Sequence, residues 1–314
     1  MAASSPSPWP VLPALSEWEA TCTTVHMWLQ IIGKIRLAQS PWVNHSWGAA
    51  LYVTPQGVTT ALIPHAGGAF SIDMDWTAHV LRIQTVHGET RTIALRPMPV
   101  ADFYATLMEA LNRLGVPVQI MARPVEVEEA IPFAEDTTHA AYDADAIHRF
   151  WKALVQADRV LKSFRASFVG KASPVHLFWG AFDLAATRFS GREAPTHPGG
   201  VPNCADWVMQ EAYAHELASA GFWPGAGVGE AAFYAYMYPE PDGFQEIEVS
   251  PDAAYYHRDL GEFVLPYEAV RTAPDPDAAL HGFLQCTYEA GATLGQWDRT
   301  RLEREAAMPP AQQT

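Results

Sequence analysis

The first part of the chain combines one long amphipathic stretch with several short apolar ones. From Ser16 to about Leu37, apolar residues recur at steps of three and four, which predicts a helix with Ser16 as its N-cap. Pro41 is expected to end that helix, because proline cannot continue it. The buried stripe of this helix is expected to be Trp18, Cys22, Val25, Leu29 and Ile32.

Short segments rich in β-branched and aromatic residues follow, and Gly, Pro or polar turns separate them. They predict an antiparallel meander of four strands, with a further hairpin turn at residues 87–90 leading to another strand. A helix over residues 100–114 closes this part, with Phe103, Leu107 and Leu111 on one face. The four strand segments are residues 47–55, 57–64, 69–76 and 79–86.

The second part begins after a connector, residues 116–142, which contains three prolines, an acidic run and some strand character at 116–127. A long helix is predicted from Asp143 to about Phe168, a long strand or hairpin over 175–189, and a Gly/Pro-rich loop over 190–203. A short helix over 208–218, strands at 231–239 and 262–270, and a last helix over 277–294 complete the pattern.

These elements predict an α+β fold, in which antiparallel sheets are flanked by long helices. We expect a flexible Pro/Ser-rich arm (1–14), a first half (15–115), the connector (116–142), a second half (143–297) and a charged, disordered tail (298–314). The halves contain similar short motifs: Ser40-Pro41, His45 and Trp47-Gly48-Ala49 in the first resemble Ser173-Pro174, His176 and Trp179-Gly180-Ala181 in the second. One interpretation is an internal duplication with pseudo-two-fold symmetry, and the other is two α+β units with common turn residues.

Composition and charge restrict the partners and the cellular compartment that we expect for this protein. The 314 residues carry a net charge of −15, and this acidic balance argues against nucleic-acid binding, which needs a basic surface. Cys22, Cys204 and Cys286 have neither disulfide nor zinc spacing, which fits a reducing compartment. Neither a signal peptide nor an apolar run of membrane-spanning length is visible, so we expect a cytoplasmic protein without a membrane partner.

The segment over residues 173–192 holds the most unusual polar residues. On a regular strand, His176, Arg188 and Arg192 share one face, while Asp183 points the other way with Trp179 and Thr187; a bulge at Gly180 would reunite them. The functional hypothesis makes His176 and Asp183 catalytic and assigns an anionic group of the substrate to Arg188 and Arg192. The alternative is a structural Asp–Arg pair with a hydrogen-bonded core histidine.

A metal site is a second hypothesis for the polar residues. Glu211 and His215 are four residues apart on the predicted short helix, so their side chains would share a face. His176 and His257 are candidates to complete a divalent-metal site. The motif lacks the second histidine of the HExxH signature, and such pairs are common on ordinary helix surfaces.

Aromatic residues suggest where a ligand would lie. Trp179, Tyr234 and Tyr236 are candidates to line a pocket between the halves, with His257 as a further catalytic candidate, although aromatic stripes on strands more often belong to a core. No dinucleotide fingerprint or phosphate-binding loop is present, so no nucleotide cofactor is expected.

Several blocks of the sequence resemble one bacterial family that is known only as a domain of unknown function. The resemblance spans about residues 15–297 and implies one conserved module, but it implies no catalytic residue, cofactor or substrate. The blocks are GKIRLA, NHSWGAALYVTP, GKASPVHLFWGAFDLAATRFSGR, EAYAHELASAGFWPG and FYAYMYPEP.

The first functional hypothesis is therefore a small-molecule enzyme with acid/base, hydrolase-like chemistry in an aromatic-walled pocket between the halves. The alternatives are a non-catalytic protein that binds a small ligand or a partner, and a metal-dependent enzyme that uses a His/Glu site.

Overall fold

The computed structural model describes residues 8–304, and their fold contains two antiparallel sheets of six strands each. The N-terminal sheet has the strand order β1-β2-β4-β5-β6, and β3 pairs with the same edge of β4 as β2 does. Strands β4 and β5 are antiparallel neighbours, and their register places Ile72 opposite Ile83. Its strands are β1 (Tyr52–Val53), β2 (Gly57–Thr59), β3 (Ile63–His65), β4 (Gly68–Asp75), β5 (Val80–Thr85) and β6 (Thr90–Ala94).

The C-terminal sheet is an unbranched run in the order β11-β12-β10-β9-β8-β7. Alternate residues of its strands face opposite sides, as the two-residue period of a strand requires. The two sheets meet at one point, where the backbones of Leu51 and Leu177 exchange both of their N–H···O bonds. The strands are β7 (His176–Phe178), β8 (Asp183–Glu193), β9 (His215–Trp223), β10 (Ala232–Tyr238), β11 (Tyr255–His257) and β12 (Glu262–Pro266).

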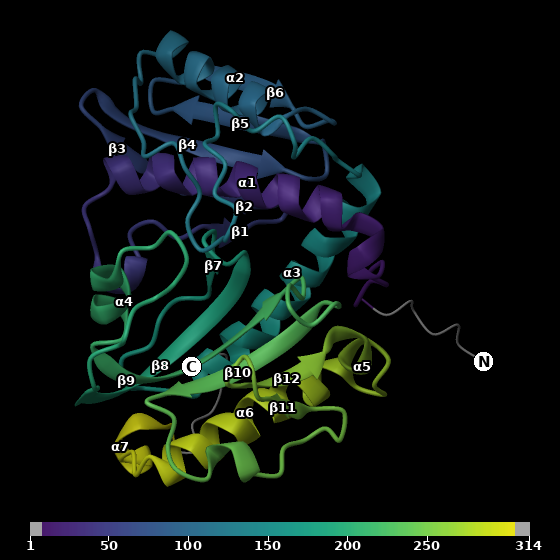
Figure 1. The fold of residues 1–314 in the computed structure, drawn as a ribbon, viewed down its shortest axis with the longest axis vertical. Coiled ribbons are helices and arrows are strands. Elements are labelled where there is room, and N and C mark those ends of the chain that lie inside the picture. Colours follow the sequence, from purple (N-terminus) through teal and green to yellow (C-terminus); the bar gives the residue numbers. More distant parts are fainter. Residues whose placement is uncertain (1–7, 305–314) are drawn as a thin grey trace, which may run out of the picture.

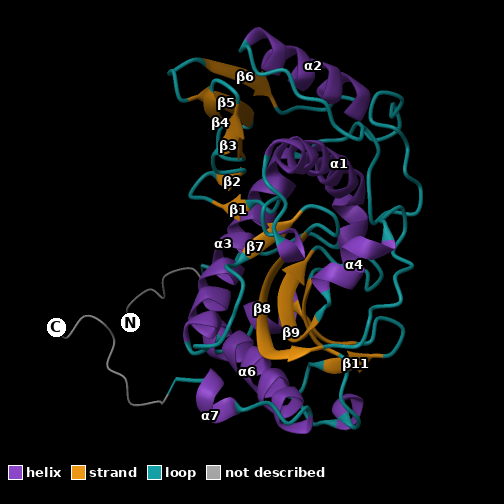
Figure 2. Cartoon of the chain, turned by 90° about the vertical axis from the view of Figure 1, so that its left-hand side faces the viewer, coloured by secondary structure: helices purple, strands orange, loops and turns teal. Residues whose placement is uncertain are grey.

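Helices cover the sheets on defined sides. Figure 2 shows α1 and α2 on one face of the N-terminal sheet, α3 and α6 on one side of the C-terminal sheet, and α4 on its other side. The helices are α1 (Leu15–Gln39), α2 (Val100–Arg113), α3 (Ala144–Ala166), α4 (Asp206–Ala212), α5 (Tyr267–Arg271), α6 (Pro276–Leu294) and α7 (Arg299–Leu302), with 3-10 turns at Asn44–Ser46 and Phe244–Glu246.

Helix α1 runs through the middle of the molecule, between the N-terminal sheet and the elements of the second half (Figure 1). From Met27 to Arg36 every residue is buried, including the polar Gln30, Lys34 and Arg36. A helix that is buried on all sides does not show a clean amphipathic stripe. The helix therefore forms part of the core of both halves rather than covering one of them.

The predicted α+β class is confirmed, whereas the internal duplication is not. The N-terminal sheet branches at β4, but the C-terminal sheet does not branch. His45 lies in a 3-10 turn, and its proposed counterpart His176 lies on a strand. The two similar sequence motifs therefore adopt different local structures, and they do not support a repeated unit.

Several sequence-based boundaries need correction. Helix α1 begins at Leu15 without a side-chain cap, so Ser16 is not its N-cap. The helix predicted over 208–218 ends at Ala212, because residues 215–223 form β9 and pair with β8 and β10 on both sides. The segment 175–189 is a hairpin, and the connector 116–142 contains no strand.

The described residues near both ends of the chain pack against the rest of the protein. The arm and tail predictions fall partly on residues 1–7 and 305–314, which lie outside the described residues. Within the described part, Trp9 is only 2% exposed, packs against Phe233 and Tyr267, and donates a hydrogen bond to Asp277. Near the C-terminal end, residues 299–302 form helix α7, and the backbone of Glu303 forms an isolated β-bridge with Phe168. Residues 8–14 and 298–304 are thus part of the fold.

Among residues 8–304, no helix combines the length and the apolar character needed to cross a lipid bilayer.

We predict that Trp9→Ala lowers the free energy of unfolding by about 3–5 kcal/mol, the usual cost of removing a buried tryptophan. The matched control is Val11→Ala, because Val11 is 55% exposed in the same segment and should change stability by less than about 0.5 kcal/mol. Urea unfolding measures both values, and equal effects of the two substitutions would contradict the docking of the arm.

Candidate functional site

A cavity of about 510 Å³ lies between α1, the connector and the face of the C-terminal sheet that is turned away from α3 and α6. This volume is within the range of small-molecule sites. Helix α4 and the loop before it contribute to the lining, and Figure 2 shows α4 beside the C-terminal sheet. Its walls include Lys34, Trp42, Glu126, Phe178, Trp179, Asp183, Cys204, Trp207, Tyr213, Ser219, Trp223, Tyr234, Tyr236 and Glu262.

Strand alternation selects which residues face the cavity. On β8, Asp183, Ala185 and Thr187 line it, while the intervening residues point toward α3 and α6. On β10, Tyr234 and Tyr236 line it, and their neighbours Phe233 and Ala235 belong to the main core. Successive residues of the segment FYAYMY therefore alternate between the core and the pocket wall.

Asp183 is the central carboxyl group of the site. Tyr234 donates its hydroxyl hydrogen to Asp183 Oδ2, and Gly221 on the neighbouring strand leaves room for that hydroxyl. A Cβ atom at Gly221 would lie 2.6 Å from the Tyr234 oxygen. Burial raises the pKa of Asp183 to about 6, although the Tyr234 hydrogen bond works in the opposite direction.

Glu126 brings a second carboxyl group from the connector. Its side chain lines the cavity and is accessible from it. Partial loss of water around the carboxyl group, followed by the charge of Asp183, raises its pKa to about 7, while the charge of Lys34 acts in the opposite direction. Its backbone is in the left-handed region, with φ 59°, which is unfavourable for a residue with a long side chain. The Glu126 N–H donates to the Pro202 carbonyl oxygen at 2.8 Å, which holds this conformation.

Gly180 is needed for the Glu126 carboxyl group to occupy its position. A Cβ atom at Gly180 would lie 2.0 Å from Glu126 Oε1, so only glycine leaves that space open. Glu262 on β12 contributes the third carboxyl group, and burial followed by the charge of Asp183 raises its pKa to about 7. Three carboxyl groups with raised pKa values thus line one cavity.

Helix α1 holds the connector and the β7–β8 turn together through the buried side chain of Gln30. The Gln30 amide donates to the Val125 carbonyl at 2.7 Å and accepts from the Val125 N–H at 3.0 Å. It also donates to the Gly180 carbonyl at 3.2 Å, and His26 Nε2 lies 2.8 Å from the same oxygen. These bonds place Glu126 and Gly180 against each other.

Lys34, one turn further along α1, is the basic residue closest to these acids. Its Nζ lies 5.6 Å from the centre of the Trp179 ring. Trp179 itself packs on Gly33, where a Cβ atom would lie 2.2 Å from the indole ring, and donates from Nε1 to the Ala49 carbonyl at 2.9 Å. The tryptophan is therefore held rigidly over the lysine.

Four hydroxyl groups lie on the part of the cavity wall that the C-terminal sheet and the end of α4 form. The hydroxyls of Tyr213 and Tyr236 are 2.7 Å apart, and those of Thr187 and Ser219 are 3.0 Å apart. Burial raises the pKa of Tyr213 to about 12, so this phenol stays protonated and can donate a hydrogen bond at neutral pH.

Two exposed indoles border the cavity where α4 meets the loop over residues 41–48. Trp42 and Trp207 are 41% and 53% exposed, and their ring centroids are 5.1 Å apart. Trp42 Nε1 donates to Glu211, which ties α4 to this loop. Glu211 thus has a positioning contact at the edge of the site.

Of the predicted site residues, Asp183, Trp179, Tyr234 and Tyr236 line the cavity. His176 does not; it packs among Trp47, Tyr52 and Phe178, and burial lowers its pKa to about 4. His257 lies on β11, the edge strand of the sheet, and also does not line the cavity.

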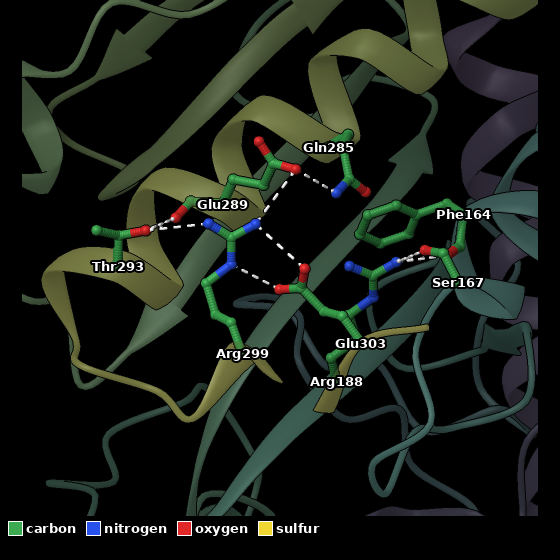
Figure 3. Close-up of polar contacts among 8 residues, drawn as sticks. All are labelled: Phe164, Ser167, Arg188, Gln285, Glu289, Thr293, Arg299 and Glu303. Atoms are coloured by element: carbon green, nitrogen blue, oxygen red, sulfur yellow. Dashed lines mark hydrogen bonds and ion pairs between the residues drawn. The ribbon is translucent and has the colours of Figure 1, made fainter. Parts of the chain in front are cut away.

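Arg188 lies on the other face of the sheet, so its proposed role in holding an anion in the cavity has no support from its position. Figure 3 shows its guanidinium donating to the Phe164 carbonyl and the Ser167 hydroxyl of the α3 end. It also packs over the rings of Phe164 and Tyr288, 3.5 Å and 4.2 Å from their centres. Asp183 and Arg188 therefore face opposite sides of the sheet, and they do not form the structural pair considered as the alternative.

Arg192 lies near the surface end of β8, also away from the cavity. It donates to Glu216 at 2.6 Å and to the carbonyl groups at the end of α6. Arg192 thus forms its ion pair with Glu216 near the protein surface and not with a group in the cavity.

The proposed metal ligands do not come together. His215 begins strand β9, so it does not share a helix face with Glu211. Among residues 8–304, no three His, Cys, Asp or Glu side chains form a group able to hold a metal ion. The metal hypothesis for His176, Glu211, His215 and His257 therefore has no geometric basis in the described part of the chain.

Sequence reasoning missed Glu126, Glu262, Lys34 and Tyr213. Glu126 belongs to a charged run between prolines, which is typical of an exposed linker. Lys34 is a signal that the sequence does contain, because it lies in a mostly apolar stretch of helix in a chain with only four lysines. A charged residue at such a position needs a polar environment, and here the cavity provides it.

We predict that Arg188→Ala lowers the free energy of unfolding by about 2–5 kcal/mol, because a buried side chain packed on three aromatic rings is removed. Arg192→Ala is the matched control and should cost no more than about 1 kcal/mol, since its ion pair is exposed. Urea unfolding of both variants is the measurement. A loss of similar size in both would contradict the structural role of Arg188.

Asp183→Asn is predicted to stabilise the protein at pH 8 by about 1–3 kcal/mol and to have little effect at pH 4. The raised pKa means that the folded state holds the proton more tightly than the unfolded state. The stabilising contribution of protonated Asp183 is therefore present below about pH 4 and is lost as the pH rises through about 6. Urea unfolding at both pH values tests this, and a variant that is destabilised at pH 8 would contradict it.

Comparison with known proteins places the chain in a family. A search of curated proteins and a search of solved structures return no match. A family model described as "Family of unknown function (DUF5996)" matches residues 9–304, which include both sheets and every residue of the cavity. The chain therefore belongs to this family of unknown function.

Proposed function

We propose that the protein is an enzyme that transfers protons to and from a small organic substrate in the 510 Å³ cavity. The observation that carries this proposal is the placement of three carboxyl groups with raised pKa values in one aromatic-walled pocket. Carboxyl groups that titrate near neutrality are suited to general acid/base catalysis, because they can both release and accept a proton at working pH.

Asp183 and Glu126 have different roles in this proposal. Asp183 has the lower pKa, about 6, and accepts a hydrogen bond from Tyr234, so it is the group that ionises first and acts as the base. Glu126, with a pKa of about 7, keeps its proton longer and acts as the acid. The charge of Asp183 disfavours ionisation of Glu126, which separates the protonation states of the two groups.

The lining residues favour an uncharged substrate with an apolar body. Trp179, Trp223 and Phe178 offer flat apolar walls, and the hydroxyls of Tyr213 and Tyr236 offer hydrogen-bond partners. Arg188 and Arg192 lie outside the cavity, so they do not provide a site for an anionic group of the substrate there. A protein that only binds such a molecule is the competing possibility, and it would not depend on the ionisation of Asp183.

The experiment is a turnover screen with chromogenic aryl esters, amides and glycosides, followed by variants on any active compound. We expect Asp183→Asn and Glu126→Gln to lower kcat by about 10²–10⁴-fold, as removal of a general acid or base does. The dependence of the wild-type rate on pH should be bell-shaped, with limbs near pH 6 and pH 7.

Asp252→Asn is the matched control, because Asp252 is exposed and lies outside the cavity. It should retain wild-type kcat. Turnover that survives both Asp183→Asn and Glu126→Gln would contradict the proposal. Binding of the compounds by the wild type and both variants alike, without turnover, would favour the binding protein instead.

A further inference from the structure

The side chain of Lys34 is a charged group of the cavity that proton transfer by Asp183 and Glu126 leaves unused. It is 5% exposed and lines the cavity from α1. Within residues 8–304, its ammonium group has no hydrogen-bond or ion-pair partner; it lies 5.6 Å from the centre of the Trp179 ring and close enough to Cys204 and Glu126 for their charges to act on it. A buried lysine without such a partner is costly, so its position calls for a ligand or a chemical role.

We infer that Lys34 is a nucleophile that forms an imine with an aldehyde or ketone bound in the cavity, a substrate class that rests on the proposed acid/base function. Three observations support this inference: an amine without a hydrogen-bond or ion-pair partner, an aromatic-lined pocket around it, and the carboxyl group of Glu126 in the same lining. Amines that form imines in proteins are typically held in this kind of apolar, partly desolvated setting.

The amine must be uncharged to react, and the surroundings promote this state. Burial lowers the pKa of Lys34 from its ordinary value, while Cys204 and Glu126 act in the opposite direction. Because Glu126 has a raised pKa and is largely protonated below pH 7, its opposing influence is weakest under the conditions where it can serve as an acid.

The chemical steps balance with the groups present. The Lys34 Nζ lone pair attacks the carbonyl carbon, and a proton moves from nitrogen to the former carbonyl oxygen to give a carbinolamine. Glu126 then donates its proton to the carbinolamine hydroxyl, the C–O bond breaks, and water leaves as the C=N bond forms. The product is an iminium ion beside the Glu126 carboxylate. Hydrolysis by the reverse steps restores the free lysine.

Trp179 and the carboxyl groups suit the cationic product. The Trp179 ring faces Lys34 Nζ and can stabilise a positive charge there through its π-electrons. Asp183, the group that ionises first, supplies a base that can remove a proton from the carbon next to the iminium. The same site would then perform the acid/base chemistry proposed above on an activated carbonyl compound.

Reductive trapping tests the inference, and the chain contains its own controls. Only four lysines are present, and Lys152, Lys162 and Lys171 are all exposed. The full-length protein is treated with benzaldehyde and cyanoborohydride at pH 7, and peptide mass spectrometry measures the benzyl adduct at each lysine over time. We expect Lys34 to react at least about tenfold faster than the other three, since each unit by which its pKa falls multiplies the uncharged fraction tenfold.

Variants separate an imine from general reactivity. Lys34→Arg keeps the positive charge but should abolish the fast adduct, and Lys34→Met serves as a second variant if circular dichroism shows that the arginine variant does not fold. Glu126→Gln should slow labelling of Lys34 about tenfold or more and leave Lys152 unchanged, because only the proton donor is removed.

An independent readout distinguishes failure of the inference from failure of the proposed function. The indole N–H signal of Trp179, identified by its loss in Trp179→Phe, reports occupancy of the cavity in NMR spectra. A signal that shifts with benzaldehyde while Lys34 reacts no faster than Lys152 overturns the imine and leaves the acid/base proposal standing. No shift and no preferential labelling overturns the inference, and the chromogenic screen then decides the proposed function separately.

Discussion

The buried amide of Gln30 is the interaction on which the site depends. It pairs with both backbone groups of Val125 and also reaches the Gly180 carbonyl, so one side chain of α1 fixes the connector and the β7–β8 turn. Neither of these two segments is part of a regular sheet at that point. Without Gln30, the N–H and carbonyl groups of Val125 would lose these partners, and an unsatisfied buried group of this kind costs about 1–3 kcal/mol.

This arrangement explains why α1 is buried on all sides. The helix contacts the N-terminal sheet with one side, carries the connector with another and presents Lys34 to the cavity with a third. The cavity therefore has its floor in the C-terminal sheet and its roof in the first half of the chain. Both halves must be folded before the charge of Asp183 can raise the pKa of Glu126.

The site holds groups in states that cost stability. Three carboxyl groups with raised pKa values, an unpartnered lysine and a glutamate with positive φ all raise the free energy of the folded protein. These groups line one cavity beside a core that is mostly apolar. A cavity that keeps these unfavourable states together is typical of a site where chemistry or binding takes place.

The sequence by itself determined the α+β class, the long helices near residues 15–39, 144–166 and 276–294, and the placement of Asp183 and Arg188 on opposite strand faces, because these follow from local periodicity. It also marked Trp179, Tyr234 and Tyr236 as candidates for a pocket wall. Tertiary structure alone decided that His215 belongs to a strand, that Arg188 lies under α3, and that Glu126 and Lys34 reach the cavity. These positions depend on contacts between residues about 90 to 150 positions apart, such as Gln30 with Val125 and Gly180, and no local pattern encodes them.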